Sequence, residues 1–523
     1  MDGMYDVAVV GGGHNGLVAA AYLARAGRKV VVCERRPVVG GAAVSAHPFG
    51  PEFTVTSLSY VVSWLPTDMV RDLRLAEHGY HVYEQGPYFA PRQDGGYLSL
   101  PDDPDEQIAK FSKHDVEAYH RWEEWMGRLG AIVGPLLDAV PPKVGSKRPG
   151  DLLGQARLAA KLSGVDVRTA FDLTRLFTAS IADLVEDRFE SDAMRGVLSV
   201  SGVIGTWAGP RSAGTAYVML HHHIGDTAWG FPRGGMGAVT QAMASAAKGF
   251  GAELRTSAPV ARIDVHDGRT TGVTLETGEE IRAKTVITTA HPKISFLDLI
   301  DESQLPDDFV ADIRGWRSRS GVVKINLAVD RLPVFTAHPE PDPSVYGGTI
   351  VLAESLDDIE CAYQEAAAGQ PATLPFADVC IPSVLDPTLA PEGKHVVSMF
   401  TQWVPHTYAD RPDQAAVDAY AARAIARMEA VAPGFIDSIV GQQVIGPHQM
   451  QEEYGLVGGN IFHGDLTPGQ MFHCRPAAGY ADLRTPIRGL FQAGSATHGG
   501  GGVTGVPGRN VVRIVLKALR NAA

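Results

Sequence analysis

Short apolar runs alternate with amphipathic stretches along the chain, and the first three predicted elements follow one another within residues 5–33. Residues 5–10 (Tyr-Asp-Val-Ala-Val-Val) have the length and composition of a buried strand. A glycine-rich turn separates them from a helix-like stretch that reaches Ala26, and a second apolar run covers residues 29–33. Strand, helix and strand in this order predict a βαβ unit, and therefore an α/β fold.

The same periodicity predicts elements further along the chain. Residues 256–263 and 271–275 alternate like two strands with Asp267-Gly268 as the turn between them, and residues 283–289 form another buried strand. Two more strands are predicted over residues 321–329 and 395–403. Helices are predicted over residues 105–129, 170–198, 414–431 and 509–519.

The turn after the first strand carries the first candidate chemistry. Gly11, Gly13 and Gly16 fit the pattern G-x-G-x-x-G, whose glycines allow a tight turn, a close approach to a pyrophosphate, and packing of helix against strand. A helix that begins near His14 and Asn15 directs its free N–H groups and the positive end of its dipole at the phosphates. The pattern predicts a dinucleotide site rather than a glycine-rich loop without a ligand.

The residues after the second strand indicate which dinucleotide is expected. Glu34 stands where an acid accepts both ribose hydroxyls of an adenosine. Arg35, a short spacer, Gly40-Gly41 and Ala42 follow. This segment resembles the first βαβ unit of the flavin-dependent amine oxidase and phytoene desaturase superfamily, which ends in an acid, a basic spacer and a Gly-Gly pair. The resemblance implies that the backbone of Gly40 and Gly41 passes beside the pyrophosphate of FAD, so FAD is the expected cofactor.

A second glycine-rich segment, near the end of the chain, fits the same cofactor. Gly494 and Ser495 follow a short apolar run, and Val503 and Thr504 follow four consecutive glycines. The segment resembles the C-terminal flavin motif of phytoene desaturases and of the pyridine nucleotide-disulphide oxidoreductase domain-containing protein 2 group. The resemblance implies that this loop holds the ribityl chain and the isoalloxazine. It also implies that Val260 meets the adenine through its backbone, although a hairpin without ligand contact accounts for Val260 as well.

These segments predict a fold of two domains. Residues 1–80, 230–295 and 485–523 are expected to form a discontinuous FAD-binding Rossmann-like domain of the glutathione-reductase type. Residues 81–229 and 296–484 are expected to form an inserted, mixed α+β substrate domain with a helical part. The run Pro232–Gly237 resembles the segment where desaturase-like proteins re-enter the flavin domain.

Composition and charge narrow the function. A formal net charge of −13 argues against nucleic acid as a partner. No uncharged stretch reaches the length of a membrane span. Little chain precedes the first strand, so we expect no signal peptide and a cytoplasmic protein. Residues 138–149, with three prolines and basic neighbours, are interpreted as a solvated linker; a patch that touches a membrane is the alternative, so peripheral membrane association stays open.

The cysteines argue against one flavoprotein class. Cys33, Cys361, Cys380 and Cys474 form no C-x-x-C pair, and the glycine cluster 234–237 does not follow a predicted strand. Flavoprotein disulphide reductases need two adjacent thiols and a second dinucleotide motif. With one dinucleotide site, electrons come from the substrate and leave to oxygen, a quinone or another carrier.

Two residues are candidates for catalysis. Lys324 interrupts an apolar strand and shares one face of it with Asn326. In amine oxidases a lysine on the corresponding strand holds a water at flavin N5, and the alternative here is an ordinary half-exposed strand lysine. His463 lies in a glycine- and aromatic-rich loop, where it faces the flavin or is a capped loop histidine. The adjacent histidines 221–223 point in different directions, so no metal site is expected there.

The predicted substrate is hydrophobic. Seven aromatic residues lie near the segments that re-enter the flavin domain, and they suggest a bulky apolar ligand in a tunnel, with ordinary core packing as the alternative. These residues are Trp207, Tyr217, Trp229, Phe231, Trp403, Tyr454 and Phe462.

Together these features predict an FAD-dependent oxidoreductase of the phytoene-desaturase-like group, which removes hydride from a C–H bond. A flavin amine oxidase, motivated by Lys324, is the alternative among enzymes. From another class, non-catalytic escort proteins for prenylated partners resemble the same fold, but the complete phosphate motif and Glu34 argue against that role. The oligomeric state is left open.

Overall fold

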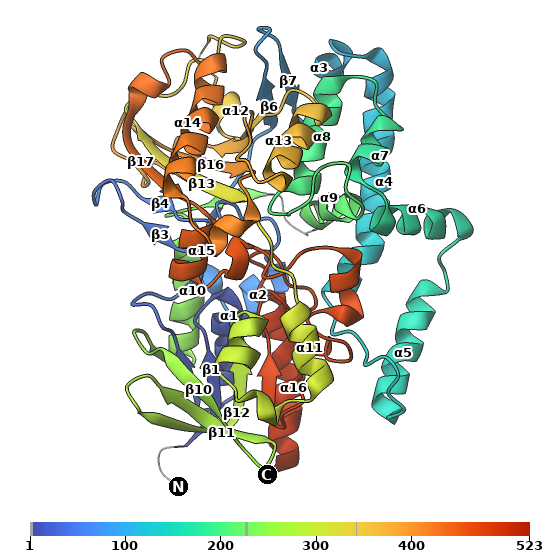
Figure 1. Ribbon diagram of the computed structural model, residues 1–523, viewed down its shortest axis with the longest axis vertical. Coiled ribbons are helices and arrows are strands. Elements are labelled where there is room, and N and C mark those ends of the chain that lie inside the picture. Colours follow the sequence, from blue (N-terminus) through green and yellow to red (C-terminus); the bar gives the residue numbers. More distant parts are fainter. Residues whose placement is uncertain (1–3, 225–228, 341, 523) are drawn as a thin grey trace.

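The computed structural model describes residues 4–224, 229–340 and 342–522, and two seven-stranded sheets organise it. One sheet lies in the lower half of Figure 1 and the other in the upper half, with a group of helices beside the upper sheet. The first sheet draws its strands from residues 5–33, 253–288 and 490–492, and the second from residues 88–100 and 322–445. The limits of the two domains themselves stay a prediction.

The first sheet has the order β10-β11-β12-β1-β2-β9, with β18 paired to the carboxyl half of β12. Its strands are β1 (Tyr5–Val10), β2 (Val30–Cys33), β9 (Glu253–Arg255), β10 (Val260–His266), β11 (Arg269–Leu275), β12 (Glu280–Thr288) and β18 (Leu490–Gln492). The helices that pack on it are α1 (His14–Arg25), α10 (Met236–Gly249), α11 (Asp307–Gly315) and α16 (Val506–Ala522).

Both faces of this sheet are buried because side chains alternate along each strand. Val7 and Val9 pack in a cluster with α1, α10 and α16, whereas Ala8 and Val10 pack in a second cluster with the β10–β11 hairpin and α11. The continuous apolar runs of β1 and β2 are therefore the pattern of strands that are covered on both sides.

The parallel strands of this sheet place their carboxyl ends at one edge. β1, β2, β12 and β18 run in the same direction. The residues that directly follow them are Gly11, Glu34, Thr289 and Ala493. Turns from distant parts of the sequence therefore meet at this edge, which is where ligands bind in open α/β sheets.

The second sheet has the order β17-β13-β16-β15-β14-β6-β7. Its strands are β6 (Tyr88–Pro91), β7 (Tyr97–Leu100), β13 (Val322–Val329), β14 (Thr349–Leu352), β15 (Phe376–Cys380), β16 (His395–Gln402) and β17 (Ile439–Ile445). The helices of this part are α12 (Pro343–Tyr346), α13 (Leu356–Ala367), α14 (Gln414–Val431) and α15 (Pro447–Tyr454). Every residue of β13 is buried, so any polar side chain on it must find its partners inside the protein.

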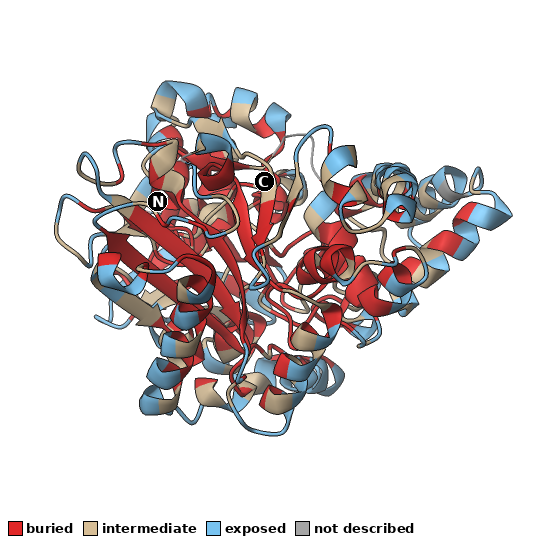
Figure 2. Cartoon of the chain, turned by 90° about the horizontal axis from the view of Figure 1, so that it is seen from above, coloured by how far each residue is buried: buried red, intermediate tan, exposed pale blue. Residues whose placement is uncertain are grey.

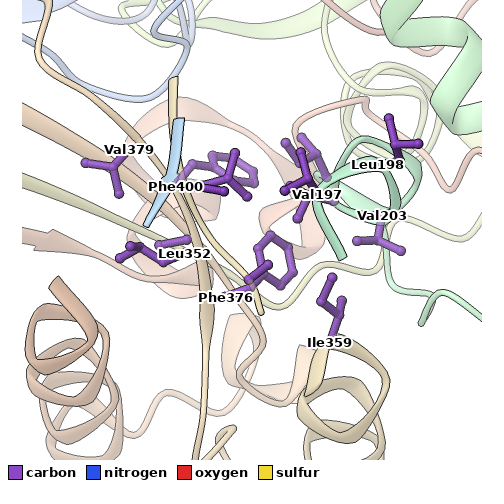
Figure 3. Packing of buried hydrophobic residues seen from close by; sticks show 14 of the residues in the cluster. Val197, Leu198, Val203, Leu352, Ile359, Phe376, Val379 and Phe400 are labelled. Atoms are coloured by element: carbon purple, nitrogen blue, oxygen red, sulfur yellow. The ribbon is translucent and has the colours of Figure 1, made fainter. Parts of the chain in front are cut away.

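The helical part consists of α3 (Asp105–Ala109), α4 (Lys113–Leu137), α5 (Pro149–Leu162), α6 (Val167–Thr178), α7 (Ile181–Glu186), α8 (Asp192–Val203) and α9 (Thr215–His223). It shares one hydrophobic cluster with the second sheet, and Figure 3 shows Val197 and Val203 of α8 among Phe376, Ile359 and Phe400. Buried residues fill the centre in Figure 2, whereas α5 stands apart at the right of Figure 1.

The remaining elements are short. They are α2 (Thr67–Asp72) and two small sheets, β3 (Ser45–Ala46) with β4 (Val55–Thr56), and β5 (Val82–Glu84) with β8 (Gly230–Pro232). Short 3₁₀ turns and a π-helical turn (Ile294–Asp298) are the other helical elements of the described residues. Among the described residues, no helix combines the length and the apolar character needed to cross a bilayer.

Two predicted helices are broken into shorter ones. The helix expected over 105–129 is α3 and α4, because Ser112 caps α4 by accepting a hydrogen bond from the Asp115 amide at 3.3 Å. The helix expected over 170–198 is α6, α7 and α8, and Ser180 and Ser191 cap the two later helices in the same way. Helical spacing of apolar residues continued across these breaks, so periodicity alone did not locate them.

Three other boundaries also differ from the prediction. The hairpin begins at Val260 rather than Thr256, because the preceding amides of Ser257 and Ala258 bond to the carbonyls that follow β2. The last helix begins at Val506, three residues early. The glycine cluster 234–237 does follow a short strand, β8, but β8 pairs with β5 outside the first sheet.

Gly508 allows α16 to pack on the start of α1, because a Cβ there would overlap the carbonyl oxygen of Asn15. We predict that Gly508→Ala destabilises the protein by about 1–3 kcal/mol, the cost of overpacking. The matched control is Gly127→Ala, which is exposed within α4 with open space around it and should be neutral or stabilising by about 0.5–1 kcal/mol. Denaturant unfolding of both variants measures the difference; equal stability would contradict the packing argument.

Candidate functional site

A cavity of about 370 Å³ lies at the carboxyl edge of the first sheet. One end is lined by the glycine turn after β1 and by Glu34, and the other by apolar and aromatic side chains from the second sheet and the helical part. Its volume is within the range of ligand pockets, about 300–1,000 Å³. The cavity therefore joins the two sheets in one site.

The nucleotide end is built around the Glu34 carboxylate. It is 6% exposed and accepts hydrogen bonds from the amides of Gly12 at 2.7 Å and Arg36 at 2.9 Å. The Arg36 guanidinium donates to the carbonyl of Gly41 at 2.9 Å, so the segment after β2 is held beside the glycine turn. A Cβ on Gly13 would meet only the Gly41 Cα, at 3.9 Å, so the protein leaves free space next to this glycine.

Most of the residues predicted from the sequence line this one cavity. Those that line it are Gly11, Gly13, His14, Asn15, Glu34, Arg35, Gly41, Ala42, Val260, Lys324, His463, Ser495, Val503 and Thr504. Gly16, Gly40 and Gly494 are not among the lining residues. A Cβ on these three would overlap Gly11 O, Ala43 O and Thr289 O respectively, so they serve close packing of backbone on backbone.

Sequence reasoning missed two segments of the wall. Leu58–Trp64 and Thr289–His291 contribute several lining residues, and Ile204, Phe400 and Met450 contribute more. Thr289 directly follows a parallel strand, a signal that was available in the sequence. Leu58–Trp64 has no glycine pattern or charge spacing that marks it, and only its position over the cavity reveals its role.

The aromatic residues divide into two groups. Trp229, Tyr454 and Phe462 line the cavity, as the apolar-tunnel prediction requires. Trp207, Tyr217, Phe231 and Trp403 do not line it; they are buried core residues, which corrects the prediction for these four. Trp403, for example, is fully buried and packs edge-on against Phe376.

Neutral histidines face the cavity. His14 Nε2 and His463 Nδ1 are buried and have no hydrogen-bond partner among the described residues. Burial lowers the pKa of both side chains to about 4, so both imidazoles are uncharged at neutral pH. Asn15 Oδ1 is buried without a partner as well, within the part of the chain that the structure describes. Such polar atoms need a hydrogen-bonding ligand, which a large polar cofactor supplies.

The three histidines at the end of α9 diverge. Hydrogen bonds join His221 to Gly501 O at 2.9 Å, His222 to Val218 O at 2.8 Å and His223 to Met219 O at 3.2 Å. His221 and His222 also line the cavity. They therefore support the wall of the site.

Arg475 ties two loops of the site together. Its buried guanidinium donates to the carbonyls of Phe462 at 2.8 Å, Ser495 at 3.0 Å and Thr497 at 3.2 Å. Burial lowers the pKa of Arg475 to about 10, so it remains protonated at neutral pH. This cation was not foreseen, because a lone arginine in a loop gives no signal in one sequence.

Lys324 is fully buried in β13 at the far end of the cavity, which rules out the half-exposed alternative. Its ammonium donates to Asn326 Oδ1 at 2.5 Å and Ser398 Oγ at 2.7 Å. Asn326 thus shares the face of Lys324 but bonds to it instead of lining the cavity. Burial lowers the pKa of Lys324 to about 7.

Comparison with known proteins agrees with this arrangement. The family described as flavin containing amine oxidoreductase matches residues 16–508, nearly the whole chain. The chain belongs to this family. A relative from Rattus norvegicus, pyridine nucleotide-disulfide oxidoreductase domain-containing protein 2, is 38% identical over 99% of this chain and 94% of its own length.

Two other similarities are more distant. A limonene dehydrogenase subunit from Castellaniella defragrans is 26% identical over 98% of this chain and 94% of its own length. The solved structure of cyclohexylamine oxidase from Brevibacterium oxydans shares the fold with a TM-score of 0.60, at 17% identity over 99% of both chains. The flavin oxidoreductase family confirms FAD as the cofactor and the FAD-binding α/β fold predicted from the sequence.

Substitutions of Gly13 test the predicted position of the FAD pyrophosphate. Its φ of −71° suits any residue and the space beside it is free, so Gly13→Val should fold normally. We predict that its side chain fills the space of the pyrophosphate and abolishes FAD binding, while Gly13→Ala weakens it less. The visible absorbance of bound flavin and the unfolding midpoint of the cofactor-free protein measure both effects. Full flavin occupancy in Gly13→Val would mean that the site is misplaced.

Substitutions of Glu34 test the predicted contact between this carboxylate and the ribose of FAD. We predict that Glu34→Ala weakens FAD binding by about 1–3 kcal/mol, because polar partners of the carboxylate are left unpaired. Glu34→Gln keeps one acceptor oxygen and the shape of the side chain, so it should lose less. Isothermal titration of the cofactor-free variants with FAD measures the loss. Equal affinity of wild type and Glu34→Ala would remove Glu34 from the site.

Proposed function

We propose that the chain is an FAD-dependent dehydrogenase that removes hydride from a hydrophobic substrate and forms a double bond. The observation that carries the proposal is the apolar end of the cavity, which continues directly from the nucleotide end. Its wall includes Leu58, Trp64, Ile204, Phe400, Ile461 and Phe462. An apolar wall of this kind favours a ligand without charge.

The charges of the cavity wall support the same substrate class. The nucleotide end contains Glu34, Arg35, Arg36 and Glu276. Glu276 belongs to it because its amide bonds to the Pro259 carbonyl, next to Ala258, whose amide bonds to the Glu34 carbonyl. Among the lining residues, Lys324 is the one Lys, Arg, Asp or Glu side chain at the apolar end. The Lys324 ammonium is already hydrogen-bonded to two side chains, so it is not free to bind a carboxylate or phosphate group of a substrate.

We assign the cofactor contacts from the same geometry. The glycine turn and the start of α1 would hold the pyrophosphate, Glu34 the ribose, and Val260 the adenine. Ser495, Val503 and Thr504 would lie along the ribityl chain and ring. When bound, FAD supplies the two-electron acceptor for hydride at its N5.

The residues of the chain then bind and orient the substrate. Trp64, Trp229 and Phe462 exclude water from the apolar end. His14 and His463, uncharged and without partners among the described residues, are hydrogen-bonding groups for the polar ligand atoms between the two ends. Lys324 is the candidate catalytic residue of the chamber, and Arg475 joins the loops of Phe462 and Ser495 by hydrogen bonds to both.

The name of one relative supports a hydrophobic substrate, because limonene is a hydrocarbon. We also propose that the reduced flavin is reoxidised by oxygen, a quinone or another carrier.

We further propose peripheral contact with a membrane. Val144, before α5, is 64% exposed, and Leu152 and Leu153, on α5, are 47% and 52% exposed; Lys147 and Arg148 lie beside them in the sequence. An apolar surface with adjacent cations suits an anionic bilayer.

A flavin amine oxidase is the second candidate. The burial of Lys324 in the cavity wall favours it, since that position suits a lysine that acts beside a bound cofactor. The apolar lining without an acidic side chain near Lys324 on the wall favours the first candidate. Membership in an oxidoreductase family argues for either enzyme over an escort protein.

Anaerobic titration of the FAD-loaded protein tests the proposal. We predict that isoprenoids, acyl chains or steroids bleach the flavin absorbance and that small polar amines do not, because only the former match an uncharged chamber. Lys324→Met serves as a companion variant. Bleaching by small amines alone, and its loss in Lys324→Met, would overturn the dehydrogenase in favour of the amine oxidase.

A further inference from the structure

A polar cluster lies in the second sheet, behind the apolar end of the cavity. It consists of Lys324 on β13, Asp378 and Cys380 on β15, and Tyr60 from the segment after β4. Lys324, Asp378 and Cys380 are at most 4% exposed. Two strands of one sheet and a loop therefore bring together one basic and one acidic side chain inside an otherwise apolar core.

Tyr60 is the link between this cluster and the cavity. Its side chain lines the cavity together with Lys324, whereas Asp378 does not line it. The Tyr60 hydroxyl lies near the Asp378 carboxyl group, and this interaction lowers the pKa of Asp378. The Lys324 ammonium lies 5.7 Å from the centre of the Tyr60 ring. Tyr60 therefore lies between the cavity, which it lines, and Asp378, which does not line it.

The charges of the cluster are loosely paired. Lys324 donates hydrogen bonds to Asn326 and Ser398. It also interacts electrostatically with Asp378, and this interaction affects the pKa of both groups. Burial raises the pKa of Asp378 to about 7 and lowers that of Lys324 to about 7. Burial also raises the pKa of Cys380 and Tyr60, and that of Tyr88 on β6, so these three stay protonated at neutral pH.

We propose that Tyr60 and Asp378 form the acid–base site of the oxidation, with Tyr60 as the catalytic residue and Asp378 as the proton acceptor behind it. The inference rests on the proposed function. The substrate loses two electrons and one hydrogen as hydride to FAD, and it loses a second hydrogen as a proton to the Tyr60 oxygen. Tyr60 passes its own hydroxyl proton to the Asp378 carboxylate, and the substrate gains one double bond.

The histidines that line the cavity are weaker bases than Asp378. The pKa values of His14 and His463, at about 4, lie well below neutrality. The pKa values of His221 and His222 are lowered similarly by burial, to about 4 and about 3. A proton acceptor works best when its pKa is near the working pH. Asp378 and Lys324 meet that condition and the histidines do not, and the Lys324 nitrogen is already bonded to Asn326 and Ser398.

The first experiment observes Asp378 in the FAD-loaded protein without any substrate. Infrared difference spectra recorded between about pH 5 and pH 9 should show a carboxylic acid band that disappears as the pH rises through neutrality. Asp378→Asn should lack this band. Tyr60→Phe should shift its midpoint to higher pH, because Asp378 loses the interaction with the Tyr60 hydroxyl that lowers its pKa. Absence of a neutral-range carboxyl titration in the wild type would overturn the proposal whatever the substrate.

The second experiment follows flavin bleaching by the most effective hydrophobic compound of the panel. Tyr60→Phe and Asp378→Asn should each slow bleaching by roughly 10²–10⁴-fold and remove its dependence on pH near neutrality, with the affinity for the compound unchanged. Tyr88→Phe is the matched control: Tyr88 is a buried tyrosine that also lies near Asp378, but its side chain does not line the cavity, so rate and pH profile should stay as in the wild type.

The outcomes separate the two proposals. A titrating carboxyl with no bleaching by any hydrophobic compound would sink the proposed function and its acid–base step, but not the proton-binding site itself. Bleaching at the wild-type rate in Asp378→Asn would sink the acid–base site and leave the proposed function intact. Slowing in Tyr88→Phe as large as in Tyr60→Phe would show a general packing defect and would overturn the role of Tyr60.

Discussion

The close approach of one piece of backbone to another at the carboxyl edge of the first sheet is the constraint on which the site depends. Gly16, Gly494 and Gly508 each stand where a Cβ would overlap a carbonyl oxygen of another segment. Since no side chain stands between them, α1, the end of β12 and the C-terminal loop converge on the turn after β1. Residues almost 500 positions apart, such as Asn15 and Ser495, come within 3.4 Å between Nδ2 and Oγ as a result.

This convergence creates a cavity with two chemically different ends. The nucleotide end uses backbone amides and a carboxylate, which suits a ligand rich in phosphate and hydroxyl groups. The apolar end belongs to the second sheet and the helical part, whose shared hydrophobic core holds it in shape. The first sheet thus provides the end suited to a cofactor, and the second sheet and the helical part provide the end suited to a substrate.

Burial, more than ion pairing, sets the electrostatics of this site. The cavity histidines are uncharged because they are removed from water, and Arg475 keeps its charge while it is bonded to backbone carbonyls. In the same way, Lys324 and Asp378 are both moved toward neutrality by desolvation. A site of this kind holds few permanent charges, which is consistent with chemistry that transfers hydrogen without a charged substrate group.

The sequence by itself determined the local units of this protein. The βαβ start, the glycine motif, Glu34, the hairpin after Val260 and the C-terminal loop could be predicted because turn chemistry and side-chain periodicity act over a few residues. Helix breaks at Ser112, Ser180 and Ser191 were missed because capping competes with a periodicity that continues across them.

Only the tertiary structure decided which residues share the cavity. It separated Trp229 and Phe462, which line the cavity, from Trp207 and Trp403, which are core. It also placed Tyr60 against Asp378, over 300 residues away in the chain. The physical reason is that burial and pKa depend on what packs around a side chain from other strands, and that neighbourhood exists only after the two sheets have come together.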